Sequence, residues 1–384
     1  MGACARLGRV GRDGIPDVAI VGGGIVGCSS AAFLAEAGVD VELFEREALA
    51  GAASGRNSGS IQHPFDPVLG DLHFETLRHL AELEGFELPG SPAGVLMLGN
   101  EPDALEASAA AIARDQPELE PRLLDPDAVL ELEPALSREL WACRLETGYP
   151  VRPAAATLAF AERARRGGAT LHEGRKARPW LVDGELRGVL ADGEPYAAGA
   201  VLVCAGPWTP QLIDPTGSWR PIVAVWGVVL DVAMDDPPRH VVEQVGVEEV
   251  AAGSQSGAPD SIFSLVPTDG DVSVGSTFLA EEPDPVAWIP ELRRRAQRFV
   301  PAVGHAHVQG ARACARPVSL DGRPLVGPLV TDGLWVAAGH GPWGISTGAA
   351  TGRLVADALL GRAEIPEALT ASRMGNPPPE RRPT

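Results

Sequence analysis

Lysine is almost absent from this chain of 384 residues. Among its 32 basic side chains, one is a lysine, Lys176, and the rest are arginines. A Schiff base to pyridoxal phosphate or to a carbonyl substrate needs a buried lysine amine. Such chemistry is therefore almost excluded at every position other than 176.

Positive charge is scarce as well, because 51 aspartates and glutamates oppose those 32 basic residues and give a formal net charge of −19. A chain this acidic repels the phosphate backbone of nucleic acids and the anionic headgroups of lipids. We therefore expect neither a nucleic-acid partner nor attachment to a membrane surface.

Long apolar runs and paired cysteines are also missing. The longest apolar stretch, residues 222–230, is too short to span a bilayer, so no integral membrane segment is expected. Residues 1–16 contain no apolar run before a cleavage site and do not resemble a secretory signal. The five cysteines are odd in number and form no Cys-x-x-Cys pair, which argues against a disulfide frame and a metal site. These features favour a reducing compartment, and we expect a cytoplasmic protein.

Glycine, by contrast, is abundant at 45 residues, so a glycine motif needs support from its context. Residues 22–27 have the spacing G-x-G-x-x-G between an apolar strand at 18–21 and an apolar helix. The next strand ends in Glu45, at the spacing where a carboxylate accepts the ribose hydroxyls of a dinucleotide. This context favours a dinucleotide-binding turn over a purely structural one. Glu45 disfavours a 2′-phosphate, and Arg46 is expected to face the adenine or solvent.

Two further glycine-rich segments indicate that the dinucleotide carries a flavin. Residues 51–59 are dense in small hydrogen-bond donors, which a flavin enzyme keeps near its cofactor and a nicotinamide enzyme does not need. The alternative is a solvated surface loop. Residues 339–348 precede a helix whose N-terminus would stabilise the negative charge of a reduced flavin. Here the alternative is an ordinary connection with Ser346 as the helix N-cap.

Hydrophobic periodicity predicts the remaining elements only coarsely. A β-rich region is expected over 219–280. The expected helices are 154–166, 288–300 and 346–360, and the expected buried strands include 200–205 and 334–338.

Five segments in one order resemble the superfamily of FAD enzymes that includes D-amino-acid oxidase, glycine oxidase, sarcosine oxidase and D-amino-acid dehydrogenase. The resemblance extends over about residues 17–373. The segments that carry it are 17–27, 54–59, 201–208, 316–327 and 339–352.

This resemblance implies an α/β fold. A discontinuous, Rossmann-like FAD-binding domain is expected to carry an inserted, β-rich α+β domain that covers the flavin and binds the substrate. The expected boundaries are 15–80, 145–215 and 310–373 for the FAD-binding domain, 81–144 and 216–309 for the substrate domain, and 1–14 and 374–384 for flexible termini.

The motifs and the resemblance together assign the residues that bind FAD. In the family, the turn at 205–208 closes over the cofactor and a strand near Ala177 contacts the adenine. The residues expected to bind FAD are Gly22, Gly24, Ile25, Val26, Gly27, Glu45, Arg46, Ser54, Arg56, Asn57, Ser58, Gly59, Ala177, Ala205, Gly206, Trp208, Cys314, Gly339, His340, Gly341, Gly344, Ile345 and Ser346.

The activity implied by the resemblance is oxidation of a C–N bond in a small amine or amino acid. Hydride moves from the α-carbon to flavin N5, and the imine then hydrolyses; this requires orientation more than a strong base. Arg316 is expected to hold a substrate carboxylate with its two-donor fork, the alternative being an ion pair with a residue such as Asp321. Gln62, His63 and Trp343 are further candidates for the catalytic pocket, although a lone histidine is more often structural.

Two positions depart from the sarcosine oxidase pattern. Cys314 has the spacing of the cysteine that binds flavin covalently there, but the residues that follow differ, so a small buried thiol is the alternative. Ser273 stands where those enzymes use a lysine to activate oxygen. The electron acceptor is therefore oxygen or, as in a dehydrogenase, another molecule. Further alternatives are a flavin hydroxylase, a flavoprotein of RNA modification and a flavin-binding subunit of a larger dehydrogenase, and a homo-oligomer stays open.

Overall fold

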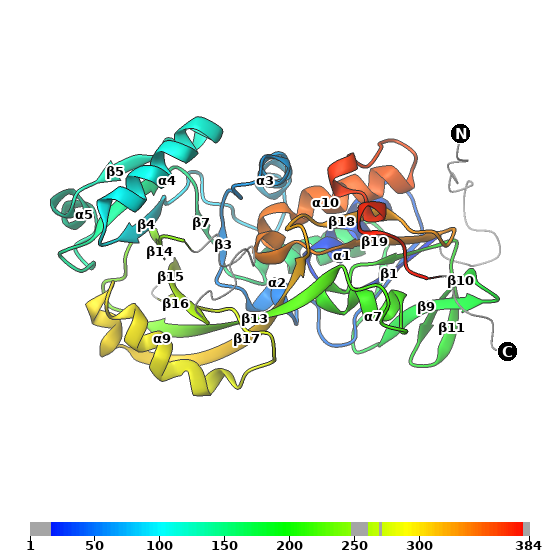
Figure 1. The fold of residues 1–384 in the computed structure, drawn as a ribbon. Coiled ribbons are helices and arrows are strands. Elements are labelled where there is room, and N and C mark those ends of the chain that lie inside the picture. The colour runs from blue at the N-terminus through cyan, green and yellow to red at the C-terminus, as the bar shows by residue number, and fades with distance from the viewer. Residues whose placement is uncertain (1–16, 247–259, 269–270, 379–384) are drawn as a thin grey trace.

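We describe a computed structural model in which residues 17–246, 260–268 and 271–378 are placed. The expectation of a flexible N-terminus over 1–14 lies outside these residues, as does that for 379–384. Figure 1 shows an elongated molecule with a helix-covered lobe at one end and a second lobe, dominated by a large sheet, at the other. None of the described helices combines the length and apolar character needed to cross a bilayer.

The first lobe is centred on a six-stranded sheet. Strands β1, β2, β8, β12 and β19 run parallel, and β18 pairs antiparallel with β19 at the edge. Each residue of β1 is buried, as expected for a central parallel strand covered on both faces. In spatial order the strands are β18 (Leu325–Pro328), β19 (Leu334–Ala338), β12 (Ala200–Val203), β1 (Val18–Val21), β2 (Val41–Phe44) and β8 (Thr170–His172).

Four helices accompany this sheet. Helix α1 packs against α10 and α6, and α10 also packs against α3. The α1–α10 contact is close, because the Ser29 hydroxyl reaches the Gly348 carbonyl at 3.3 Å, and a Cβ on Gly352 would lie 2.1 Å from the Ser29 oxygen. The helices are α1 (Ile25–Glu36), α3 (Pro67–Ala81), α6 (Ala155–Arg166) and α10 (Gly344–Leu359).

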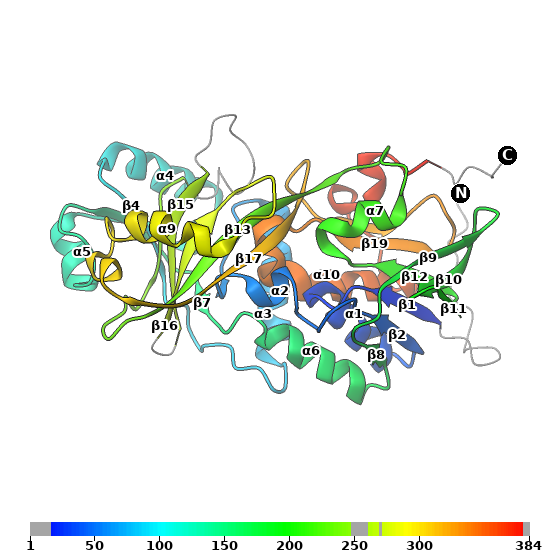
Figure 2. The same ribbon diagram turned by 90° about the horizontal axis from the view of Figure 1, so that it is seen from below.

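Smaller elements complete the first lobe. Both views place the three-stranded sheet at the end of the molecule far from the second lobe (Figures 1 and 2). The elements are β9 (Ala177–Val182), β10 (Glu185–Ala191), β11 (Glu194–Ala197), α2 (Ala53–Arg56), the pair β3 (Ser60–Ile61) and β7 (Tyr149–Pro150), and α7 (Thr209–Ile213).

The second lobe contains an eight-stranded sheet assembled from two separate stretches of chain, 95–145 and 222–319. Strands β13 and β17 are its longest members and extend from it toward the first lobe (Figures 1 and 2). In spatial order the strands are β17 (His307–Ser319), β13 (Ile222–Ala233), β16 (Asp271–Thr277), β15 (Ser261–Thr268), β14 (Val241–Gln244), β4 (Val95–Gly99), β6 (Trp141–Leu145) and β5 (Arg122–Leu124). The helices of this lobe are α4 (Pro102–Asp115), α5 (Pro126–Leu132) and α9 (Ile289–Ala296).

The structure confirms the predicted mixed α/β class. The expected helices appear as α6, α9 and α10, and the expected β-rich region supplies β13 to β16. The longest apolar run, residues 222–230, forms most of β13 and is thus a strand within a sheet. The domain boundaries given above remain a prediction, since strand order alone does not define where one domain ends.

Candidate functional site

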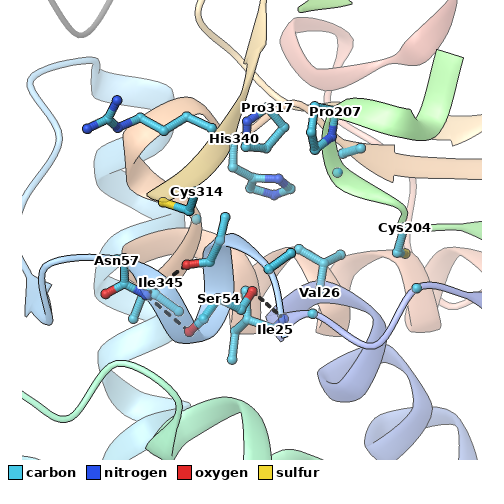
Figure 3. Close-up of a pocket in the computed structure, with 18 of the residues that line it drawn as sticks. Ile25, Val26, Ser54, Asn57, Cys204, Pro207, Cys314, Pro317, His340 and Ile345 are labelled. Atoms are coloured by element: carbon cyan, nitrogen blue, oxygen red, sulfur yellow. Dashed lines mark hydrogen bonds between the residues drawn. The ribbon is translucent and has the colours of Figure 1, made fainter. Parts of the chain in front are cut away.

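A long pocket runs from the C-terminal edge of the parallel sheet to the eight-stranded sheet. Figure 3 shows Ile25, Val26 and Ser54 on one side of it and His340 and Pro317 on the opposite side. The predicted residues that line the pocket are Gly22, Gly24, Ile25, Val26, Glu45, Arg46, Ser54, Asn57, Ser58, Gln62, Ala177, Ala205, Gly206, Trp208, Cys314, Arg316, His340, Gly341, Trp343, Gly344 and Ile345. The predicted residues outside this lining are Gly27, Arg56, Gly59, His63, Gly339 and Ser346.

The turn between β1 and α1 requires two of its glycines. Gly22 has a φ of +114°, and a Cβ there would lie 2.4 Å from the Cys204 carbonyl oxygen. A Cβ on Gly27 would lie 2.0 Å from the carbonyl oxygen of Gly22, so Gly27 shapes the turn from outside the lining. The N-terminus of α1 therefore opens directly onto the pocket, where free N–H groups and the helix dipole favour an anion.

Glu45 is fixed at the end of β2. One carboxylate oxygen accepts a hydrogen bond from the Gly23 N–H at 2.7 Å, and the other accepts one from the Glu47 N–H at 2.9 Å. Next to it, the Arg46 guanidinium stacks on the ring of Trp208 at 3.8 Å. Lys176, the single lysine of the sequence, also lines the pocket, beside Ala177. We call the lining from 22–26, 45–47, 176–177 and 204–208 the loop-built part of the pocket.

The serine-rich segment crosses the middle of the pocket as helix α2 and the residues after it. Ser54 accepts a hydrogen bond from the Ile25 N–H at 3.0 Å, which attaches this segment to the first residue of α1 (Figure 3). Asn57 donates to the carbonyls of Ala53 and Ser54 and accepts from the Gly59 N–H, which holds the segment in a tight turn. Arg56 is exposed and does not line the pocket, but its carbonyl accepts a hydrogen bond from Arg312 on β17 at 3.1 Å.

The third glycine-rich segment forms the opposite wall at the start of α10. His340 is buried, its Nε2 lies 3.0 Å from the Thr351 hydroxyl, and burial lowers its pKa to about 4. The imidazole is therefore neutral at physiological pH. The alternative with Ser346 as N-cap is wrong, because the helix is capped at Trp343 and Ser346 lies within its first turn. The Ser346 hydroxyl instead accepts a hydrogen bond from the Gln62 N–H at 3.1 Å.

Arg316 lies on β17 with its guanidinium inside the pocket. Nη1 donates to the Thr277 carbonyl at 2.9 Å, Nη2 donates to the Ser276 hydroxyl, and the group lies 4.6 Å above the Phe278 ring. Burial lowers the pKa of this arginine. Gly227 makes room for it, since a Cβ there would lie 2.3 Å from Nη2.

The alternative role for Arg316, an ion pair with Asp321, is wrong. Asp321 pairs with Arg373 at 2.7 Å. Within residues 17–246, 260–268 and 271–378, no ion pair joins Arg316 to a carboxylate. In the part of the chain that the structure describes, its half-buried guanidinium thus contacts neutral acceptors and the face of an aromatic ring.

Gln62 and His63 are neighbours in sequence but point to different places. The Gln62 side-chain amide lines the pocket and donates to both carboxylate oxygens of Glu243, at 3.2 and 3.3 Å. His63 lies behind the lining, with its ring 5.3 Å from that of His73. Burial lowers the pKa of His63, and neither ring nitrogen has a hydrogen-bond partner in the described part of the chain.

The eight-stranded sheet and the residue that follows β16 contribute lining residues that the sequence analysis missed: Val229, Glu243, Ser264, Ser276 and, after β16, Phe278. We call these, together with Gln62, Cys314 and Arg316, the strand-built part of the pocket. A signal was present in β14 and β15, where Glu243 and Ser264 each directly follow a pair of apolar residues. A polar residue inside such a strand marks a buried polar site, but which site it belongs to depends on strand pairing. No group of acidic, histidine and cysteine side chains in the described residues is arranged to hold a metal ion.

Comparisons with known proteins agree with this architecture. The family model for DAO, described as FAD dependent oxidoreductase, matches residues 17–358. The glycine oxidase of Bacillus licheniformis is 27% identical over 378 residues, which cover 93% of this chain and 97% of that enzyme. A glycine oxidase of Pseudomonas aeruginosa is 32% identical, but the match spans only 51% of each chain.

A second group of relatives and a solved structure extend the comparison. A D-amino acid dehydrogenase of Rhizobium johnstonii is 30% identical over 315 residues, covering 77% of this chain and 68% of the relative. The crystal structure of iminodiacetate oxidase from Chelativorans sp. BNC1 superimposes with a TM-score of 0.80 at 25% identity, covering 95% of this chain and all 100% of the other.

Proposed function

The chain belongs to the DAO family of FAD-dependent oxidoreductases, and from this premise we propose that it oxidises the C–N bond of a small amino acid whose carboxylate is bound by Arg316. The observation that carries the proposal is the half-buried guanidinium of Arg316, which lines the pocket without a carboxylate partner among the described residues. A charge that is partly removed from water and has only neutral partners is costly, and an anionic substrate would offset that cost. A planar, two-donor guanidinium also matches the geometry of a carboxylate.

The loop-built part of the pocket fits FAD. The tight turn that a Cβ on Gly22 or Gly27 would disrupt, and the N-terminus of α1 beside it, suit a pyrophosphate. Glu45 is held by backbone N–H groups in an orientation that leaves lone pairs for ribose hydroxyls. We assign the adenine to the wall of Ala177, Arg46 and Trp208, and the ring system to the middle of the pocket between Asn57 and His340. When bound, FAD supplies the acceptor for the hydride of the substrate α-carbon.

The residues around the substrate orient it rather than exchange protons with it. Arg316 is held by Thr277, Ser276 and Phe278, and Gly227 gives it space, so the carboxylate is bound in one place. His340 carries no charge at neutral pH and adds no competing cation near Arg316. Orientation of this kind is what a hydride transfer from carbon requires.

We propose that FAD is bound without a covalent bond to Cys314. This thiol lines the pocket, and burial raises its pKa although the charges of Arg316 and Arg312 act in the opposite direction. A protonated thiol is a poor nucleophile. Precipitation of the protein with acid should therefore leave the yellow colour in solution, whereas colour that stays with the pellet would contradict the proposal.

An electron acceptor other than oxygen is the second candidate for the oxidative half-reaction. Ser273 is buried and accepts a hydrogen bond from Arg312 at 3.0 Å, so no amine is present where sarcosine oxidases carry a lysine. Lys176 lies in the loop-built part, next to Ala177. The likeness to D-amino acid dehydrogenases supports the same idea. The cytoplasmic location expected from cysteine usage stays a prediction.

One experiment tests the activity and the acceptor. The purified protein should show a flavin spectrum that bleaches without oxygen on addition of glycine, sarcosine, proline or other D- or L-amino acids, but not of the corresponding amines that lack the carboxylate. Reoxidation by air, compared with reoxidation by an artificial acceptor, then separates an oxidase from a dehydrogenase. Absence of bound flavin, or equal bleaching by amines without a carboxylate, would contradict the proposed function.

A further inference from the structure

Arg312 is a charged residue beside the pocket that the proposed function leaves without a role. It lies on β17 with Cys314 and Arg316, and residues two apart on a strand project from the same face of the sheet. Cys314 and Arg316 both line the pocket. So does Val229, which lies opposite Arg312 in the register of β13 and β17. Arg312 is therefore on the pocket face of the sheet, directly outside the lining.

The guanidinium of Arg312 donates along one edge to two consecutive carbonyls. Nε donates to the carbonyl of Arg56 at 3.1 Å, and Nη2 donates to that of Asn57 at 2.8 Å. Both carbonyls belong to the end of α2, and this helix packs against β17. The parallel N–H groups of a guanidinium fit such a pair of acceptors, whereas an ammonium group has no fixed pair of donors.

The other contacts of Arg312 hold it to the eight-stranded sheet. Nη2 also donates to the Ser273 hydroxyl on β16 at 3.0 Å, and Nη1 pairs with the carboxylate of Asp231 on β13. Asp231 and Ser273 lie opposite each other in the strand register. Because the chain itself engages all three nitrogens, the guanidinium is suited to holding α2 against the sheet and not to binding a substrate.

We propose that Arg312 is a positioning residue that sets the distance between the flavin ring and the bound substrate. This inference rests on the proposed function, which assigns the ring to the middle of the pocket beside Asn57 and the substrate carboxylate to Arg316. Arg312 is bonded to the Asn57 carbonyl and lies four residues before Arg316, on the order of 14 Å along the strand. One strand of a sheet therefore connects the two groups between which hydride moves.

A looser connection would slow hydride transfer rather than weaken substrate binding. A displacement of about 1 Å between reacting groups can cost about 100-fold in rate. The guanidinium of Arg316 has its own partners on and directly after β16, and none of them is Arg312. The carboxylate site therefore keeps its shape when Arg312 is changed, and the expected signature is a lower rate at constant substrate affinity.

Arg312→Lys tests the proposal on the FAD-loaded protein. Lysine keeps a positive charge for Asp231 but cannot bind two carbonyls with a fixed pair of donors. Anaerobic mixing with an amino acid that bleaches the wild-type flavin gives the limiting rate of bleaching and the substrate concentration at half that rate. The limiting rate should fall by about ten- to a hundred-fold, and the half-maximal concentration should change by less than about three-fold. Arg312→Ala, which removes every contact, should lose at least as much rate.

Hydrogen exchange gives a readout that needs no substrate. The Gly59 N–H donates to Asn57 Oδ1 at 2.8 Å, within the turn that Arg312 holds. Exchange of this amide should become about ten-fold faster in Arg312→Lys, because the turn opens more often. The amides of β15 should exchange as in the wild-type protein, which checks that the sheet is intact.

Arg144→Ala is the matched control. Arg144 lies on β6 of the same sheet, is half-buried, and in the described part of the chain gives its hydrogen bonds to Glu146 rather than to α2. This variant also removes an arginine from an ion pair within the sheet. It should change neither the limiting rate of bleaching nor the exchange of the Gly59 amide.

The outcomes separate this proposal from the proposed function. An unchanged limiting rate in both Arg312 variants would overturn the positioning role, whatever the exchange of Gly59 shows, and would leave the proposed function standing. A higher half-maximal concentration at an unchanged limiting rate would place Arg312 in substrate binding and would overturn it too. If no amino acid bleaches the wild-type flavin, the proposed function falls, and the positioning role falls with it.

Discussion

The two parts of the pocket are built by different means. The loop-built part is shaped mainly by backbone atoms. They form the turn at Gly22 and the open N-terminus of α1, and they hold the Glu45 carboxylate through N–H groups. In the strand-built part, side chains that lie far apart in the sequence meet, such as Gln62, Glu243 and Arg316. Glycine spacing thus specifies the first part, and strand pairing across the eight-stranded sheet specifies the second.

One residue joins the two parts. Arg312 lies on β17, four residues before Arg316, and donates to the carbonyls of Arg56 and Asn57 at the end of α2. It also pairs with Asp231 on the neighbouring strand. The serine-rich segment is therefore attached to the sheet that carries Arg316, which sets its position relative to the substrate site.

The largest effect is expected from removal of the carboxylate anchor. Arg316→Ala should raise KM for an amino acid by about 100-fold or more, because a buried charge-assisted interaction is lost. The flavin content should stay the same, since the loop-built part is untouched. Steady-state kinetics together with the visible spectrum measure both quantities, and an unchanged KM would remove Arg316 from this role.

The opposite pattern is expected at Gly27. Gly27→Ala places a methyl group 2.0 Å from the Gly22 carbonyl oxygen, and this contact is with backbone that must move. FAD affinity should fall by about ten- to a hundred-fold, from an overpacking cost of about 1–3 kcal/mol. Protein that retains flavin should keep the wild-type KM.

Gly90→Ala is the matched control for Gly27→Ala, because a Cβ at Gly90 meets nothing within 4 Å. Titration of the apoprotein with FAD, followed by fluorescence, compares the two variants. Equal FAD affinity in both would show that close packing at the turn is not what shapes this part.

A smaller effect should follow from Gly227→Ala. The added methyl group would lie 2.3 Å from Arg316 Nη2, the far end of a flexible side chain that can shift aside. We expect KM for the amino acid to rise by about ten-fold through the displaced guanidinium, with FAD affinity unchanged. Loss of flavin from this variant would contradict the separation between the two parts.

The last effect is on stability rather than on KM or FAD affinity, and it concerns the wall at His340. Its pKa is lowered to about 4 in the folded protein from an ordinary value of 6.5, so the unfolded chain binds the proton first as the pH falls. The free energy of unfolding should therefore decrease between pH 6.5 and about 4, by about 1 kcal/mol per pH unit from this group. Denaturant unfolding at several pH values measures the slope, which His340→Asn should reduce; an unchanged slope in that variant would assign the effect to other groups.

Whether a site residue could be predicted from the sequence depends on which of the two parts of the pocket it belongs to. The glycine segments, Glu45 and the helix that follows Gly22 were identifiable because their chemistry depends on local spacing, whereas Arg316 was assigned through the resemblance to the family, and its role stays a prediction. The alternative in which Ser346 is an N-cap is wrong because helix α10 begins two residues earlier, at Gly344, and a helix boundary depends on packing against neighbouring elements. His63 directly follows Gln62 in the sequence and was predicted to share its pocket, yet its ring lies next to that of His73, behind the lining.

The sequence by itself determined the family, the α/β class and the cofactor, since a dinucleotide cradle needs glycine at fixed local positions and a carboxylate one strand later. Only the tertiary structure decided which residues line the pocket together with Arg316. Glu243, Ser264 and Ser276 come from different strands, and their shared face depends on pairing and register between segments far apart in the chain. No local pattern encodes such a register, because each strand acquires its neighbours only when the whole sheet forms.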